Sequence, residues 1–173
     1  MVNTMIANTE QIWGWLAEVP DPEIPAISVV DLGIVRNVAW EDDECIVTIT
    51  PTYSGCPAML VIAESIEEAL NSRGIARFKM RTQLSPAWTT DWMSEAGKIK
   101  LKGYGIAPPA QQVIDISGIT NRLTRKRTDD LKVACPHCGS TNTRCSSQFG
   151  STPCKALYRC DDCLEPFDYF KCH

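Results

Sequence analysis

Two segments in the first half of the chain carry apolar side chains at helical spacing. Residues 10–19 have an apolar side chain at every third or fourth position, and Pro20 follows the last of them. Residues 57–72 show the same period, with glutamates on the opposite side and Gly74 just after the last turn. The pattern predicts two amphipathic helices. Their core-facing residues would be Ile12, Trp13, Leu16 and Val19 in the first, and Met59, Ile62, Ala63, Ile66, Ala69 and Leu70 in the second.

Strand-like patterns lie on both sides of the second helix. Residues 27–40 and 45–50 are rich in β-branched side chains and are separated by the acidic turn 41–44, which predicts a hairpin. Residues 75–84 alternate apolar and charged positions, which is typical of a half-buried strand. Another helix is expected over about residues 90–99. Its inward-facing residues would be Trp92, Met93, Ala96 and Ile99.

The order helix, hairpin, helix, strand, helix favours an α+β fold, a small α/β sandwich in which helices cover one sheet. We expect this domain to span residues 1–110, followed by a linker over 111–132 and a small zinc-ribbon domain over 133–173. The linker is polar and basic, which is more typical of a solvated connector than of a contact with nucleic acid or an acidic partner. Its basic cluster consists of Arg122, Arg125, Lys126 and Arg127.

The composition of the 173-residue chain is that of an ordinary globular protein, with 44% hydrophobic and 22% charged residues. A net charge of −4 gives no general attraction to nucleic acid or to anionic membranes. No apolar run approaches the roughly 18 residues of a membrane-spanning helix. Residues 1–16 lack the basic and apolar stretches of an export signal. We therefore expect a cytoplasmic protein without a membrane partner.

Nine cysteines are unusual in a cytoplasmic protein, where disulfides rarely persist. Seven of them lie in the tail, and four of these form two C-x-x-C pairs, Cys135/Cys138 and Cys160/Cys163. Each C-x-x-C turn presents two thiolates to one side of a metal, so two turns can complete a tetrahedral site. We predict a structural zinc site in a zinc ribbon. The same four thiolates would also hold a single iron or an iron–sulfur cluster.

Three further tail cysteines and both histidines of the chain fall outside this ligand set. They are Cys145, Cys154 and Cys172, with His137 and His173. Such cysteines are ordinarily small buried residues or free thiols. The alternative is a second, labile metal site that includes His173. His137 lies inside a ligand turn and is interpreted as a surface residue or a support for the ligands.

A lone cysteine, Cys56, precedes the second predicted helix. Because proline favours the first position of a helix, Pro57 would place the Cys56 sulfur beside free backbone N–H groups. The positive potential there would lower the pKa of Cys56 and make it a reactive or metal-accepting thiol; the alternative is a compact turn residue. Asp21 and Glu23 could face the same site or could simply be solvated. Cys45 lies on a predicted strand and is interpreted as a core residue.

Three segments of the first domain resemble the SufT-like family of iron–sulfur cluster assembly domains. They are DPEIPAISVVDLGIV, TPTYSGCPAM and WTTDWMSEAGKIKLKGYGIAPP. With the cysteine-rich tail, nearly the whole chain is similar to the PaaD family. That family belongs to the multicomponent phenylacetyl-CoA ring epoxidase (phenylacetate-CoA oxygenase) system of aerobic phenylacetate degradation in bacteria. The resemblance matches Cys56 to the family's characteristic cysteine and raises the interest of Asp21 and Glu23.

The resemblance implies an accessory maturation protein that helps to assemble an iron–sulfur or di-iron centre in the oxygenase and reductase subunits. Cys56 would hold iron or a cluster transiently, and the ribbon would dock on the client. Two alternatives stay open, a structural subunit of the oxygenase complex and a nucleic-acid-binding ribbon protein, although the acidic net charge argues against the second. A homodimer in which Cys56 pairs across the interface also stays open. The sequence has no phosphate loop, nucleophile elbow or histidine-based metal triad, which argues against independent catalysis.

Overall fold

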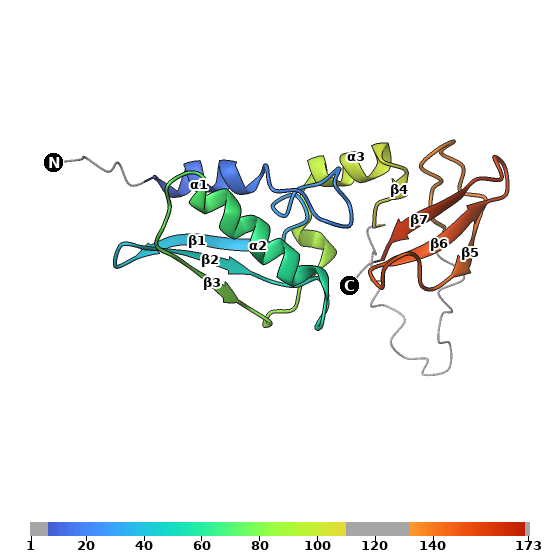
Figure 1. The fold of residues 1–173 in the computed structure, drawn as a ribbon. Helices are drawn as coiled ribbons and strands as arrows, with labels where there is room; N and C mark the ends of the chain where they lie inside the picture. The colour runs from blue at the N-terminus through green and yellow to red at the C-terminus, as the bar shows by residue number, and fades with distance from the viewer. Residues whose placement is uncertain (1–6, 110–131, 172–173) are drawn as a thin grey trace, which may run out of the picture. The chain divides into compact units, whose positions relative to one another are not determined.

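The computed structural model describes residues 7–109 and 132–171 (Figure 1). The predicted linker therefore lies outside the described residues except for its last position, and its basic cluster, Cys172 and His173 lie outside as well. The chain forms two units, divided between Lys100 and Leu101, and each is described by itself. Within the described ranges, no helix has the length and apolar character needed to cross a bilayer.

The first unit begins with helix α1 (Thr9–Leu16). Asn8 caps it, because its side chain accepts a hydrogen bond from the Gln11 N–H while the Gln11 side chain accepts one from the Asn8 N–H. Ile12 and Leu16 are buried, as the apolar spacing predicts. The helix ends before the predicted residue 19, and Val19 is buried in the turn that follows.

A three-stranded sheet forms the centre of the first unit. Strands β1 (Val35–Glu41) and β2 (Glu44–Ile49) form the predicted antiparallel hairpin, and β3 (Phe78–Thr82) pairs in parallel with β2. The strand order is therefore β1-β2-β3, with β2 in the middle. Five of the six residues of β2 are buried, among them Cys45, which confirms that Cys45 is a core residue.

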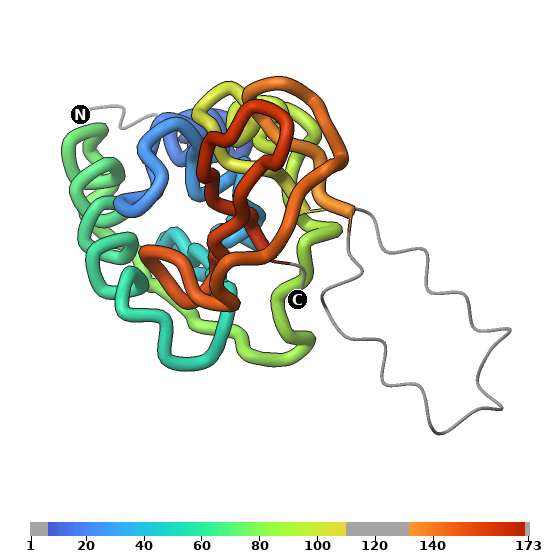
Figure 2. Tube along the Cα trace, turned by 90° about the vertical axis from the view of Figure 1, so that its right-hand side faces the viewer, coloured from blue at the N-terminus to red at the C-terminus, as the bar shows by residue number. Residues whose placement is uncertain are grey.

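Helix α2 (Ala58–Asn71) connects β2 to the parallel strand β3. It crosses β1 and β2 in Figure 1 and lies to one side of the sheet in Figure 2. Its buried residues include Ile62, Ile66 and Leu70, as predicted. Gly74 takes a φ of +84° just after the helix, and the Ile75 N–H returns to the Leu70 carbonyl. This is the termination expected of a glycine after a helix.

Two predicted elements of the first unit differ from the structure. Residues 27–34 form turns instead of the first half of a strand, and Ile27, Val29 and Ile34 are buried through tertiary packing. The helix predicted over residues 90–99 is divided into a short 3₁₀ turn (Thr90–Trp92) and α3 (Glu95–Gly103). Ser94 caps α3, because its hydroxyl accepts the Gly97 N–H at 2.8 Å. The later start turns Ala96 and Ile99 to the surface, so their predicted burial is wrong.

The second unit is built on a four-stranded sheet with the order β4-β7-β6-β5. Strands β5 (Thr143–Ser147), β6 (Lys155–Cys160) and β7 (Pro166–Phe170) are antiparallel neighbours. The short strand β4 (Ile106–Ala107) joins β7 in parallel, so these two residues belong to the sheet of the tail. The structure thus has the predicted α+β architecture with a separate β-ribbon at its C-terminal end.

Candidate metal centre and cysteine site

The first C-x-x-C turn lies ahead of strand β5 in the ribbon. The Cys135 N–H donates to the Ser140 carbonyl at 2.8 Å, and the Gly139 N–H donates to the Cys135 carbonyl at 2.9 Å. Gly139, directly after Cys138, takes a φ of +78°, a conformation that glycine adopts without strain. The backbone therefore forms a tight hydrogen-bonded turn that contains both cysteines.

The second C-x-x-C turn lies between β6 and β7. Its backbone has the same conformation as the first turn at the equivalent positions. The Cys160 N–H donates to the Glu165 carbonyl at 3.0 Å, just as Cys135 donates to Ser140. Leu164, directly after Cys163, takes a φ of +66° and so occupies the left-handed position that Gly139 fills in the first turn. A leucine there is strained, because its Cβ crowds the following carbonyl oxygen.

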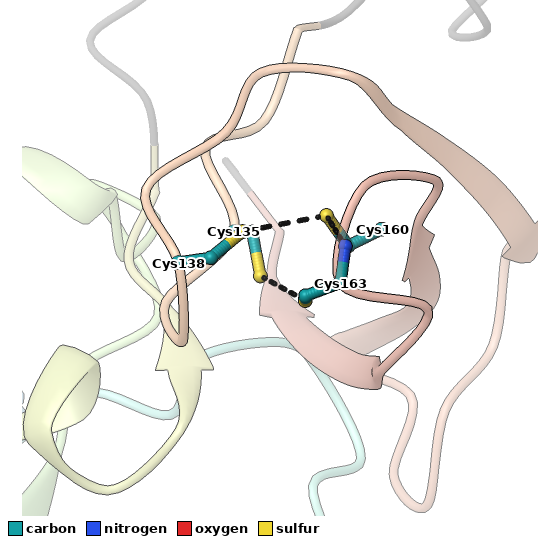
Figure 3. A group of neighbouring side chains, drawn as sticks. All are labelled: Cys135, Cys138, Cys160 and Cys163. Atoms are coloured by element: carbon teal, nitrogen blue, oxygen red, sulfur yellow. Dashed lines mark hydrogen bonds between the residues drawn. The ribbon is translucent and has the colours of Figure 1, made fainter.

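The two turns bring four sulfurs together, as Figure 3 shows. The Sγ atoms of Cys135, Cys138, Cys160 and Cys163 all lie within 4.8 Å of one another. Cys135 and Cys163 are 3.7 Å apart at their sulfurs, and Cys138 and Cys160 are 3.6 Å apart. A tetrahedral metal with bonds of about 2.3 Å to sulfur requires an edge of about 3.8 Å. The four side chains therefore fit a tetrahedral thiolate site.

Hydrogen bonds favour the thiolate form at one of the four sulfurs, that of Cys160, whereas burial and the neighbouring thiols raise the pKa of Cys138 and of Cys163. The Cys163 N–H donates to the Cys160 sulfur at 3.5 Å, and this contact is the main cause that lowers the pKa of Cys160 to about 7. Asp162 also ties the two turns together, because it accepts hydrogen bonds from Ser140 and from the Asn142 side chain. The C-x-x-C spacing did not predict these hydrogen bonds between the turns. The polar residues Ser140, Asn142 and Asp162 close to the cysteines were a signal for them.

Two further ribbon cysteines, Cys145 and Cys154, do not join this group. Cys145 packs against the ribbon core beside the Gln148 amide, and Cys154 is buried with its sulfur 3.0 Å from the Thr152 hydroxyl. The predicted labile site also needs Cys172 and His173, which lie outside the described residues, so it stays a prediction. His137 is exposed and is not one of the ligands.

Cys56 lies in the loop that joins β2 to α2. The Cys56 N–H donates to the Tyr53 carbonyl at 3.2 Å, which closes a turn through Gly55 at a φ of +86°. The helix is assigned from Ala58 with Pro57 as its cap, one residue later than predicted. The Cys56 carbonyl still accepts the Met59 N–H at 3.3 Å, so Cys56 stands at the entrance of the first turn.

The Cys56 side chain is only partly buried. Within residues 7–109 and 132–171, no hydrogen bond to its sulfur is present, so the thiol does not stabilise the fold through a hydrogen bond. Thr50, where β2 leads into this loop, has a buried hydroxyl with no hydrogen-bond partner among the described residues. The sequence pattern gave no sign of that orphaned hydroxyl.

Asp21 has a structural role that the sequence pattern did not reveal. It is buried, and its Oδ1 accepts the N–H groups of Glu23 at 3.0 Å and Ile24 at 2.8 Å. It thereby fixes the turn of the DPEI segment, in the manner of an aspartate that caps its own turn. Glu23 is half-buried. Neither carboxylate is simply solvated.

The structure does not bring Cys56 together with Asp21 and Glu23 as a group of metal ligands. Across the described part of the chain, the four ribbon cysteines are the only group of three or more potential ligands that the structure brings together in this way. A metal on Cys56 would therefore take most of its ligands from elsewhere. Cys56 as a metal-handling residue, with Asp21 and Glu23, stays a prediction.

The fold and the ribbon site define a class of protein, an iron–sulfur-assembly-type domain joined to a metal-binding ribbon. Residues 9–75 match the family described as iron-sulfur cluster assembly protein, and residues 120–171 match the PaaD zinc beta ribbon domain. Both matches agree with the resemblance found in the sequence. The C-terminal unit is therefore a zinc-ribbon domain with a metal-binding cysteine cluster.

Three similar proteins cover different parts of the chain. A putative 1,2-phenylacetyl-CoA epoxidase subunit of Escherichia coli K12 is 46% identical over 162 residues, which are 94% of this chain and 92% of that protein. An Fe-S protein maturation auxiliary factor of Porphyromonas gingivalis is 36% identical over 103 residues, 58% of this chain and 97% of that protein. The crystal structure of a DUF59 domain from Bacillus anthracis is 29% identical and covers 53% of this chain and 89% of that one, with a TM-score of 0.48.

The chain belongs to the PaaD family, since the relative from E. coli matches it over nearly its whole length. The family assignment confirms the resemblance on which the expected function rests.

Proposed function

We propose that the protein is a cytoplasmic maturation factor of the phenylacetyl-CoA epoxidase system. In this proposal Cys56 transiently holds iron or an iron–sulfur cluster that is passed to the oxygenase or reductase subunits. The ribbon binds zinc as a structural metal and takes part in docking on the client. The protein itself has no independent catalytic activity.

The names of the relatives support this combination. One relative is named as a subunit of phenylacetyl-CoA epoxidase, and another, which matches 58% of this chain, is named as an iron–sulfur protein maturation auxiliary factor. A chain that joins both kinds of similarity is well suited to serve metal centres within that one system.

The observation that carries the proposal is the environment of Cys56. Its thiol is partly exposed, hydrogen-bonds to nothing in the described part of the chain and stands at the start of a 14-residue helix. An accessible thiol of this kind can bind metal as the thiolate. Because few ligands surround it, a metal held there is bound weakly enough to be passed on. A transfer site needs that property.

The ribbon is suited to hold a metal permanently, as a structural site. Four sulfurs at tetrahedral spacing favour zinc, and a unit this small gains most of its stability from the metal. Zinc does not change its oxidation state, so it can hold the ribbon together without taking part in the transfer.

The proposal is tested by metal analysis of anaerobically purified protein, with Cys56→Ser compared with the wild type. Cys145→Ser is the matched control, since Cys145 is also partly buried but lies in the ribbon. We expect Cys56→Ser to lose iron and to keep one zinc, and client subunits matured with it to be poor in metal. Cys145→Ser should behave as the wild type. Clients loaded normally in the presence of Cys56→Ser would refute the proposal.

The name of the E. coli relative also favours a second candidate, a structural subunit of the epoxidase complex. A structural subunit would co-purify with the complex in fixed stoichiometry, and turnover of fully loaded oxygenase would depend on its addition. A maturation factor would be dispensable once the metal is in place. Adding the protein to loaded oxygenase therefore separates the two candidates.

A further inference from the structure

The outer face of α2 changes its chemical character along the helix. In the first turn Leu60 is 76% exposed and Val61 is 47% exposed. In the following turns the exposed residues are glutamates. They are Glu64, Glu67 and Glu68.

The fold does not need this apolar start. Helix α2 packs through its opposite face, and no large hydrophobic side chain in the described part of the chain is more exposed than Leu60. Single exposed apolar residues are common on protein surfaces. What distinguishes Leu60 is its place, because it lies in the first turn of the helix that Cys56 precedes, four residues further along the chain.

The three glutamates give this side of α2 a negative charge. None of the three forms an ion pair within the described ranges. The sequence also has no lysine or arginine between Arg36 and Arg73, so neighbours along the chain do not neutralise the stripe. The apolar start and the acidic continuation together form one surface, which we call the α2 face: Leu60, Val61, Glu64, Glu67 and Glu68.

We propose that the α2 face docks the client subunit that receives metal from Cys56; this inference rests on the proposed function. The docking surface of the client would carry an apolar side chain opposite Leu60 and lysines or arginines opposite the glutamates. It would also bring the ligands that Cys56 lacks.

The transfer needs no change of oxidation state. A metal–sulfur bond to Cys56 breaks as a thiolate, carboxylate or imidazole of the client forms its own bond to the metal. The Cys56 thiolate keeps its electron pair and is free to take a proton from water. For this exchange the client must approach within bonding distance of Cys56, and the α2 face is the surface that continues directly from it along the chain.

Charge favours a client over a second copy of the chain. Two copies meeting through their α2 faces would bring acidic stripes of the same sign together, which costs free energy. A basic client surface would instead be attracted, and the attraction would weaken with salt.

The test measures binding of the metal-free oxygenase subunit and of the metal-free reductase subunit, each purified, to the full-length protein by calorimetry. Leu60→Ser should raise the Kd of one of them at least tenfold, as expected for the centre of an interface. The control Leu84→Ser removes an apolar side chain that is 63% exposed elsewhere in the same unit and should leave the Kd unchanged. Glu67→Lys should weaken binding and reduce its salt dependence, whereas Glu44→Lys should not.

Each outcome bears on the proposal. Equal Kd values for Leu60→Ser and the wild type, or no binding of either subunit by the wild type, would overturn it. A wild-type dimer that dissociates in Leu60→Ser during sedimentation would also overturn it, since the occupant would be a second copy. Cys56→Ser should still bind the client. If Cys56→Ser impairs metal loading but Leu60→Ser does not, the docking surface is wrong while the proposed function stands.

Discussion

Replacing Asp31 by alanine should destabilise the first unit, because this carboxylate joins the loop before β1 to the start of α3. Its Oδ1 accepts a hydrogen bond from the Ser94 hydroxyl at 2.7 Å, and its Oδ2 accepts one from the Lys100 ammonium at 2.6 Å. The Asp31 carbonyl also accepts the Ser94 N–H at 2.9 Å. Alanine would keep that backbone bond, but it would leave the Ser94 hydroxyl, which caps α3, without its carboxylate acceptor.

The Asp31 carboxylate also accepts a longer bond from the Ser28 N–H at 3.4 Å, and its contacts with Lys100 and Ser94 differ in strength. The Lys100 side chain is 49% exposed, so solvent screens its ion pair, which contributes well under about 1 kcal/mol. The Asp31 side chain is only 13% exposed, and a hydrogen bond to a charged, mostly buried acceptor contributes about 1.5–3 kcal/mol. We expect Asp31→Ala to lower the free energy of unfolding by about 2–3 kcal/mol. In a domain of this size the melting temperature would fall by roughly 10–20 °C.

The effect should depend on pH in a defined direction. Burial alone would raise the pKa of Asp31, but hydrogen bonds from Lys100 and Ser94 outweigh it and lower the pKa. A group with a lowered pKa in the folded state stabilises the fold fully above its unfolded pKa of about 4, and this stabilisation is lost as the pH falls through the folded value. The difference between wild type and Asp31→Ala should therefore be full at pH 7 and shrink in acid.

Urea unfolding followed by near-UV circular dichroism measures this difference. The control Lys100→Ala should lose less than about 1 kcal/mol at pH 7, because only the screened contact is removed. Equal unfolding midpoints for Asp31→Ala and wild type at pH 7 would refute the reasoning. So would a difference that stays the same when the pH is lowered to about 3.

Three further substitutions test local features of the sites. Thr50→Val should raise the free energy of unfolding by about 1 kcal/mol, because the Thr50 hydroxyl is buried without a partner among the described residues; a fall in stability would contradict this. Leu164→Gly should relieve the strain of a φ of +66° and tighten zinc binding by about two- to fivefold, since metal binding and ribbon folding are coupled. Gly139→Ala should weaken zinc binding by a similar factor. Competition with a chromogenic chelator measures the zinc affinity of each variant, and an affinity of Gly139→Ala above that of Leu164→Gly would contradict the reasoning.

Local patterns were sufficient to predict most elements of the first unit and the four-cysteine cluster of the ribbon. Helix α2 follows from apolar residues such as Ile62 and Ile66 at helical spacing, and Gly74 ends it where the sequence suggests. The ribbon ligands follow from C-x-x-C spacing, because that spacing alone constrains where two sulfurs can point. Such features depend on residues within one or two turns of each other.

Features that depend on distant contacts were not predictable. Ile106 and Ala107 become a strand because β7, some sixty residues later, offers them an edge. Residues 27–34 have the composition of a strand, but hydrogen bonds such as that from the Val29 N–H to the Val19 carbonyl fold them into turns. The start of α3 was missed, since the helix was expected from about residue 90 although Ser94 is a good capping residue.

The burial of the cysteines indicates which metal could leave the protein. Cys135 and Cys160 are fully buried and belong to the core of the ribbon, so removing a metal from them would expose that core and abolish the fold of the unit. A metal that supports the fold in this way is a poor donor to another protein. Cys56 contributes nothing comparable to its own unit, because the sheet and α2 pack through other residues and its sulfur is partly accessible. The transfer that we propose would therefore start from Cys56, with the ribbon metal retained throughout.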